Sequence, residues 1–86
     1  MRVQIVVSRN VRRLRVAKGL SQETLATDTG IDRAYVGRVE RGAENPTILL
    51  LERIAKALSV PVAALFDEGG ARSRVSPLPG GRRKRA

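Results

Sequence analysis

The sequence predicts an all-α domain, a compact five-helix bundle that contains a helix-turn-helix. Three observations support this fold class. Apolar residues recur three and four positions apart, glycine or proline separates the periodic runs, and alternating strand patterns are nearly absent apart from "VQIVV" near the start. The chain of 86 residues is long enough for one domain with a modest core.

The first helix is predicted from Val7, Val11 and Leu14, which recur at positions i, i+4 and i+7. Ser8 is its expected N-cap and Gly19 its expected end. The segment "MRVQIVV" leaves three alternatives open: an extra helical turn, a dimerising strand or loose chain.

A short second helix is expected after Ser21, with Leu25 and Ala26 as its apolar pair and Gly30 as its end. The few residues "TGI" then lead directly into the next helix, and such a short connection forces a steep crossing. From composition alone, a helix-turn-helix and an ordinary corner between two helices are about equally expected.

The third helix is expected at residues 32–41, with Asp32 as its N-cap and Gly42 at its end. Val36 and Val39 point to one side, with Tyr35 beside them. The opposite side contains Arg33, Ala34, Gly37, Arg38 and Arg41. A glycine inside a helix costs about 0.5–1 kcal/mol, so a close approach to the major groove explains this face better than simple solvation.

Thr47 is the expected N-cap of a fourth helix, and Pro61 opens a last short turn or helix through "VAALF". The apolar positions of the fourth helix are Ile48, Leu51, Ile54, Ala55 and Leu58. The folded domain is therefore expected to cover residues 5–68.

Residues 69–86 contain six basic residues and no acidic ones, together with glycine and proline. Such a segment buries too little apolar surface to offset its ordering entropy, so it is expected to be a disordered basic tail. A simple solubilising end and a contribution to DNA electrostatics are equally compatible with it.

The whole chain has 17 Lys and Arg against 8 Asp and Glu, a formal net charge of +9. This excess favours an anionic partner, with nucleic acid first and an acidic membrane surface second. Base stacking on single strands is disfavoured because there is one Phe, one Tyr and no Trp. Double-stranded DNA is therefore the expected partner.

The composition disfavours an enzymatic function. There is no His for general base work, no Cys for nucleophilic attack or zinc binding, and no phosphate-cradling glycine loop. We expect neither a cofactor nor a metal. The chain also contains no apolar run of membrane-spanning length, which favours a cytoplasmic protein.

The stretch "GLSQETLATDTGIDRAYVGRVERGAENPT", followed by "LERIAKALSV", resembles the phage repressor and Cro type of helix-turn-helix, the XRE family. The resemblance spans roughly residues 7–66. It implies a five-helix, lambda-repressor-like domain that regulates transcription, as a repressor or autoregulator, and binds a palindromic operator as a homodimer. It also implies a bacterial protein that is associated with the nucleoid when bound to DNA.

The resemblance assigns roles to individual residues. Gln22 would hold a phosphate, and Tyr35, Arg41 and Asn45 would touch the DNA backbone. Arg15 would pair with Glu40 and fix the recognition helix to the first helix. The residues implied to face the bases are Arg33, Ala34, Gly37 and Arg38.

The fourth helix departs from the family pattern in the apolar run "TILLLERIAKAL". Leu49 falls among charged residues on a helical wheel, and Leu50 lies at the edge of the core face. We therefore expect a two-fold dimer built from this helix and residues 62–66. A different class of function stays open on the same fold: a protein-interaction module, such as an antitoxin or assembly factor, that binds its partner through Leu49.

Overall fold

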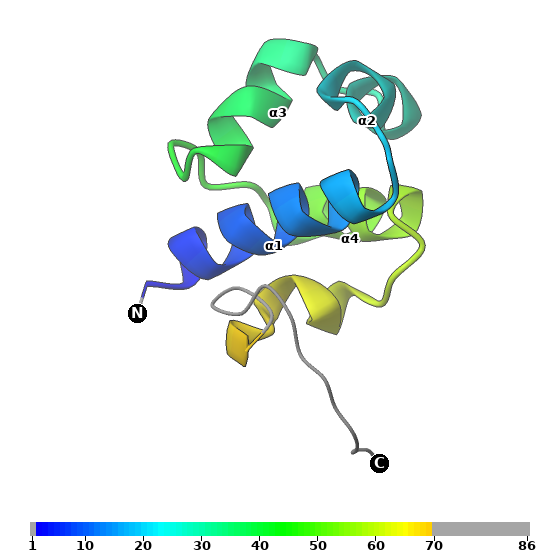
Figure 1. The fold of residues 1–86 in the computed structure, drawn as a ribbon. Coiled ribbons are helices and arrows are strands. Elements are labelled where there is room, and N and C mark those ends of the chain that lie inside the picture. Colours follow the sequence, from blue (N-terminus) through cyan, green and yellow to red (C-terminus); the bar gives the residue numbers. More distant parts are fainter. Residues whose placement is uncertain (1, 70–86) are drawn as a thin grey trace.

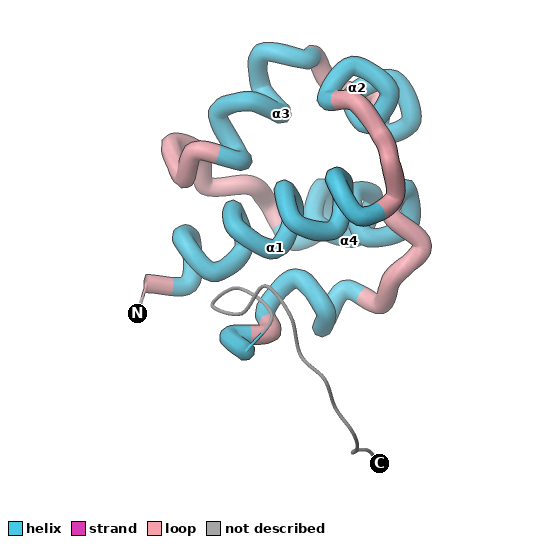
Figure 2. The backbone as a smooth tube through the Cα atoms, in the orientation of Figure 1, coloured by secondary structure: helices cyan, strands magenta, loops and turns pink. Residues whose placement is uncertain are grey.

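The computed structural model describes residues 2–69, which form a layered arrangement of helices (Figure 1). Their order is α1 (Val3–Ala17), α2 (Gln22–Thr29), α3 (Arg33–Glu40), α4 (Ile48–Ala57) and the 3-10 helix η1 (Val62–Phe66). Helices α2 and α3 lie together at one end, α1 and α4 cross the middle, and η1 closes the other end. Residues 2–69 contain no strand (Figure 2). The expected all-α class is confirmed.

The expected fifth helix is not an α-helix. The structure has four α-helices and the short 3-10 helix η1, in which the Ala64 amide donates to the Pro61 carbonyl at 2.9 Å. Five residues are too few to establish a regular α-helix, and the tighter 3-10 turn suits a short piece of chain.

Helix α1 begins earlier than expected, because residues 3–6 form an additional turn. This decides the three alternatives for the amino-terminal segment in favour of the helical one. Ser8 is therefore not an N-cap: it is buried inside α1, and its hydroxyl donates to the Ile5 carbonyl at 2.9 Å. Burial of Val6 and Val7 explains the longer helix, since packing stabilises the turn without a side-chain cap.

Helices α2 and α4 begin at hydroxyl N-caps, of which Thr47 was expected and Ser21 was not. The Ser21 hydroxyl accepts from the Thr24 amide at 3.0 Å, and the Thr47 hydroxyl accepts from the Leu50 amide at 3.1 Å. Asp32 occupies the cap position of α3 but makes no side-chain cap bond.

The core lies where α1, α2, α3, α4 and η1 meet, and it is aliphatic. Its buried members are Val7, Val11, Leu25, Ala26, Val36, Val39, Leu51, Ile54, Ala55, Leu58 and Leu65. Ile48 fits the apolar period of the fourth helix, but it lies outside the core and is 78% exposed. It lies in the first turn of α4, where no other described element covers it.

Asn10 is the buried polar residue that joins η1 to α1. Its amide donates to the Leu65 carbonyl at 2.9 Å and to the Asp67 carbonyl at 3.0 Å, and its oxygen accepts from Arg13. Nothing in the sequence pattern indicated this contact. The expected disordered tail, residues 69–86, lies outside the described residues apart from Gly69.

Candidate nucleic-acid interface

The turn between α2 and α3 depends on Gly30. Its φ of 75° lies in the left-handed region that glycine adopts without steric cost, and its amide donates to the Ala26 carbonyl at 2.9 Å. A Cβ at this position would also come within 2.9 Å of the Arg53 guanidinium. Ala26 itself is buried, and its small side chain lets α2 and α3 approach closely. The geometry is that of a helix-turn-helix.

The outer face of α3 has the exposed residues Arg33 and Ala34 in its first turn and Arg41 directly after its last residue. Tyr35 is half-buried and packs against the core with its neighbour Val36. The helical wheel therefore placed these five residues on the correct sides of α3.

Gly37 has different surroundings from those expected, because it is buried rather than open to solvent. A Cβ at this position would lie 3.3 Å from Nη1 of Arg41 and 3.9 Å from Oε1 of Gln22. The Arg41 side chain thus lies over the backbone of α3 at Gly37. The glycine leaves room for this side chain, which a helical wheel of α3 alone does not include.

Arg38 is not a free guanidinium either. Its Nε donates to Oε2 of Glu44 at 2.7 Å, and its Cζ lies 5.5 Å from the centre of the Tyr35 ring. The hydrogen bond to Glu44 raises the pKa of the Arg38 guanidinium above its ordinary value, so the side chain stays charged. Sequence reasoning missed Glu44, because it lies in the loop after α3 and helical periodicity does not determine where a loop residue lies relative to Arg38.

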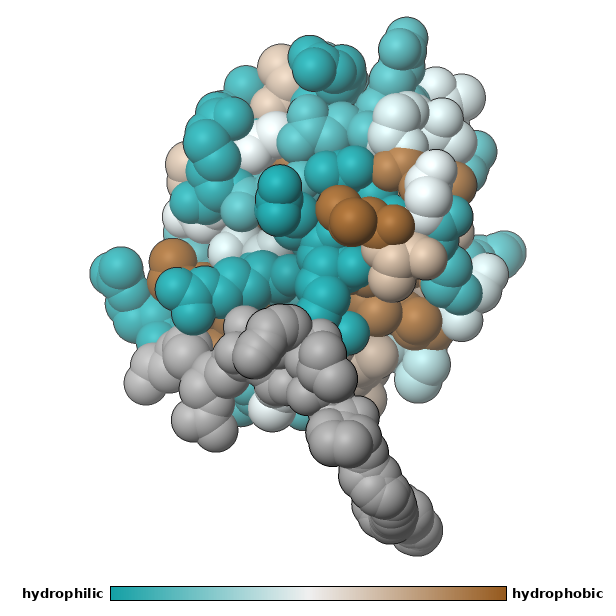
Figure 3. Space-filling model, viewed as in Figure 1, coloured by the Kyte–Doolittle hydropathy of each residue, from teal (hydrophilic) through white to brown (hydrophobic). Residues whose placement is uncertain are grey.

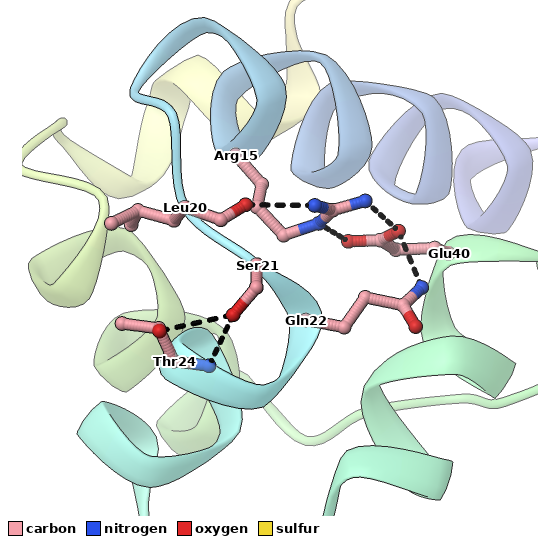
Figure 4. A network of polar contacts seen from close by, with 6 residues as sticks. All are labelled: Arg15, Leu20, Ser21, Gln22, Thr24 and Glu40. Atoms are coloured by element: carbon pink, nitrogen blue, oxygen red, sulfur yellow. Dashed lines mark hydrogen bonds and ion pairs between the residues drawn. The ribbon is translucent and has the colours of Figure 1, made fainter.

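Arg15 and Glu40 form a two-bond ion pair between α1 and α3 (Figure 4). Arg15 Nε lies 2.7 Å from Glu40 Oε2, and Arg15 Nη2 lies 3.1 Å from Oε1. The remaining Nη1 donates to the Leu20 carbonyl at 2.8 Å. Only 3% of the Glu40 side chain and 13% of the Arg15 side chain are exposed, so solvent screens the pair little.

Gln22 joins the same network from the first residue of α2. Its Nε2 donates to Glu40 Oε1 at 3.0 Å, which ties the start of α2 to the end of α3 (Figure 4). The second hydrogen of this amide stays available for another acceptor, such as a phosphate. A single carboxylate, Glu40, thus connects three helices.

A family model described as helix-turn-helix, HTH_3, matches residues 11–65. This chain belongs to the HTH_3 family.

The relatives of this HTH_3 protein include control proteins. It is 40% identical over 70 residues to the control protein C.SmaI of Serratia marcescens, covering 81% of this chain and 83% of the relative. The structure of the restriction-modification controller protein C.AhdI from Aeromonas hydrophila superimposes with a TM-score of 0.71 and 46% identity, over 73% of this chain and 96% of the other. A tetramer of the controller protein C.Esp1396I in complex with its natural 35 base-pair operator gives a TM-score of 0.70 and 36% identity, over 77% and 87%.

The remaining expected site residues of this HTH_3 domain lie after α3. Asn45 is exposed in the loop that leads to α4. Leu49 is 70% exposed, whereas Leu50 is half-buried and packs against the core. Leu49 and Ile48 therefore offer more free apolar surface than Leu50 does.

The free apolar surface of α4 borders a groove of about 480 Å³. The most exposed of its apolar lining residues are Val3 at 61%, Ile48 at 78% and Phe66 at 42%. Arg2, Val3 and Gln4 at the start of α1 also line this groove. Residues 62–66 were expected beside α4, and Phe66 does line the groove with Ile48. Sequence reasoning missed Val3, which comes from the other end of the folded domain.

On the face that Figure 3 shows, the region over α2 and α3 is mostly hydrophilic. Hydrophobic residues gather lower on this face, near the carboxyl end of α1. Among residues 2–69, no helix combines the length and the apolar character that a membrane span requires.

Proposed function

We propose that this HTH_3 protein is a sequence-specific regulator of transcription that binds double-stranded DNA and places α3 in the major groove. The observation that carries the proposal is the rigid attachment of α3. Glu40 ties its last turn to α1 and α2, while Arg33, Ala34 and Arg38 stay at least partly exposed on the other side. A helix that reads base edges must be held in this way, since small displacements break paired hydrogen bonds.

The roles proposed for individual residues follow from this placement. Arg33 and Arg38 would donate to guanine O6 and N7, with Ala34 against a base edge. Gly37, which is buried beneath Arg41, would contribute by leaving room for that side chain rather than by touching a base itself. The proposed contacts to the DNA backbone come from Gln22, Tyr35, Arg41 and Asn45.

The expected oligomer is a homodimer on a palindromic operator, in the cytoplasm and on the nucleoid when DNA is bound. Two α3 helices would then read half-sites about 34 Å apart, one turn of DNA. Leu49 and the more exposed Ile48 are the proposed centre of the contact, with Leu50 behind them. The operator complex of C.Esp1396I, a tetramer, supports an oligomeric protein of this kind.

The test is selection of bound duplexes from a random pool, followed by titration of the selected sequence. We expect a palindromic motif. Replacing Arg33 or Arg38 by Ala should weaken binding of the selected duplex by about tenfold, the loss of one paired guanine contact. Arg9→Ala is the matched control, because Arg9 is an exposed arginine of α1 on the side turned away from α3.

A protein-interaction module is the second candidate, favoured by the groove beside Ile48 and by the exposure of Leu49. Undetectable binding to random duplex at low salt would select this alternative over DNA binding. Equal affinity for all duplexes would instead indicate a nonspecific, chromatin-like protein.

A further inference from the structure

We propose that Glu44 determines the specificity of this protein by holding Arg38 in position to donate to a guanine and keeping it from phosphates. The inference rests on the proposed function and names a residue that the expected interface did not include. It makes the acidic side chain of the loop after α3 part of base recognition.

The first argument is the geometry of the pair. Glu44 Oε2 lies 2.7 Å from Arg38 Nε, and the side chains are 29% and 41% exposed. Tyr35 lies beside the guanidinium with its ring centre 5.5 Å from Cζ. The carboxylate and the ring together fix the guanidinium plane. The bond uses Nε, so the Nη hydrogens remain for a guanine, which accepts two bonds from an arginine.

The second argument is that Glu44 is itself held in place. Gln4, in the added turn of α1, donates through Nε2 to the Gly42 carbonyl at 2.9 Å and to the Glu44 carbonyl at 3.1 Å. Gly42 has a φ of 76°, and a Cβ there would come within 2.9 Å of the Ile5 side chain. The first turn of α1 therefore fixes the loop, and Gln4 is a positioning residue for Glu44.

The third argument concerns the difference between a guanine and a phosphate. A carboxylate beside the DNA repels all phosphates regardless of sequence, so it weakens binding to any duplex. An arginine that moves to a phosphate loses its bond to Glu44. An arginine that donates to guanine through its Nη groups keeps that bond. Glu44 thus weakens binding to random DNA more than it weakens binding to the correct site.

The experiment compares wild-type protein with Glu44→Gln on three duplexes: the selected motif, the same sequence with the Arg38-contacted guanine replaced, and a random sequence. Gln keeps the shape and removes the charge. We expect tighter binding to random duplex and a loss of discrimination at that guanine of about tenfold. The salt dependence on random duplex should steepen by about 0.9 in log K per log salt, one extra phosphate contact.

Three control variants separate the causes. Gln4→Ala should lower discrimination in the same direction, because the loop loses its anchor while the charge of Glu44 stays. Glu52→Gln, an exposed glutamate of α4, should leave discrimination unchanged. In the Arg38→Ala background, Glu44→Gln should have no further effect at the guanine. Circular dichroism melting checks that every variant is folded.

The outcomes distinguish the two proposals. If wild-type protein selects no motif, the proposed function fails. If it selects a motif and the folded Glu44→Gln protein discriminates equally well, Glu44 has no role in specificity. A steeper salt dependence with unchanged discrimination would also overturn the inference, since the carboxylate would then act only as a general repulsive charge.

Discussion

Glu40 is the residue on which the attachment of α3 depends. Its carboxylate accepts from Arg15 and Gln22 and is almost fully buried. In Glu40→Ala the Arg15 guanidinium stays buried without its partner, so we expect the free energy of unfolding to fall by about 3 kcal/mol. Urea denaturation measures the change, with the exposed Glu52→Ala as control. An unchanged midpoint for Glu40→Ala would contradict a structural role.

Gly37 is a second residue whose replacement separates stability from recognition. Alanine should stabilise α3 by about 0.5–1 kcal/mol through helix propensity. Its Cβ would displace the Arg41 guanidinium, which lies 3.3 Å from that position, and weaken DNA binding. Thermal melting and titration of the selected duplex test both effects. Ala34→Gly is the matched comparison for stability: it makes the opposite change in helix propensity on the exposed face of α3, so it should lower the melting temperature. Weaker folding of Gly37→Ala would show that position 37 has no room for a methyl group.

At the residue scale, the sequence predicted contacts best where a family pattern supplied them. The partnership of Arg15 and Glu40 came from the resemblance, since residues 25 apart have no spacing relation of their own. The pairing of Arg38 with Glu44 and the burial of Gly37 were not predicted. Both depend on how a loop and a long side chain fold over α3, which the period of a helix does not determine.

The α2 and α4 helices begin at hydroxyl caps, and these caps were predictable from local sequence because they act over three residues. Replacing Ser21 or Thr47 by Ala removes the acceptor for an amide of the first turn and should cost about 1 kcal/mol each. Thermal denaturation measures the loss. Thr27→Ala is the control, because the Thr27 hydroxyl donates to a helical carbonyl within α2 rather than capping its end. Equal effects at positions 21, 27 and 47 would argue against capping.

Element boundaries were wrong where packing outweighed local signals. Serine is a residue type that often caps helices, yet Ser8 lies inside α1. Burial of Val6 and Val7 stabilises the preceding turn, so α1 begins at Val3. At the start of α4, Ile48 fits the helical period but lies beyond the reach of the core. Periodicity shows which side of a helix is apolar, whereas tertiary structure decides how far along the helix that side is covered.

At the scale of the whole molecule, the exposed apolar surface at the start of α4 predicts self-association. Ile48→Ser and Leu49→Ser each remove exposed apolar area without disturbing the core, so both should shift the protein from dimer to monomer and weaken operator binding. Sedimentation velocity across micromolar concentrations measures the shift. Val16→Ser is a control of similar character, with 55% exposure on α1. A wild-type protein that stays monomeric would dismiss this dimer.

The bond network of Gln4 has a practical consequence for work with this protein. The turn that contains Gln4 holds the loop after α3, so we expect a segment fused directly to the amino end to disturb the loop that we propose to govern sequence discrimination. We therefore expect an affinity tag at the amino end to lower the sequence discrimination of a protein that still folds correctly. Binding constants should be compared only between preparations with the same amino terminus.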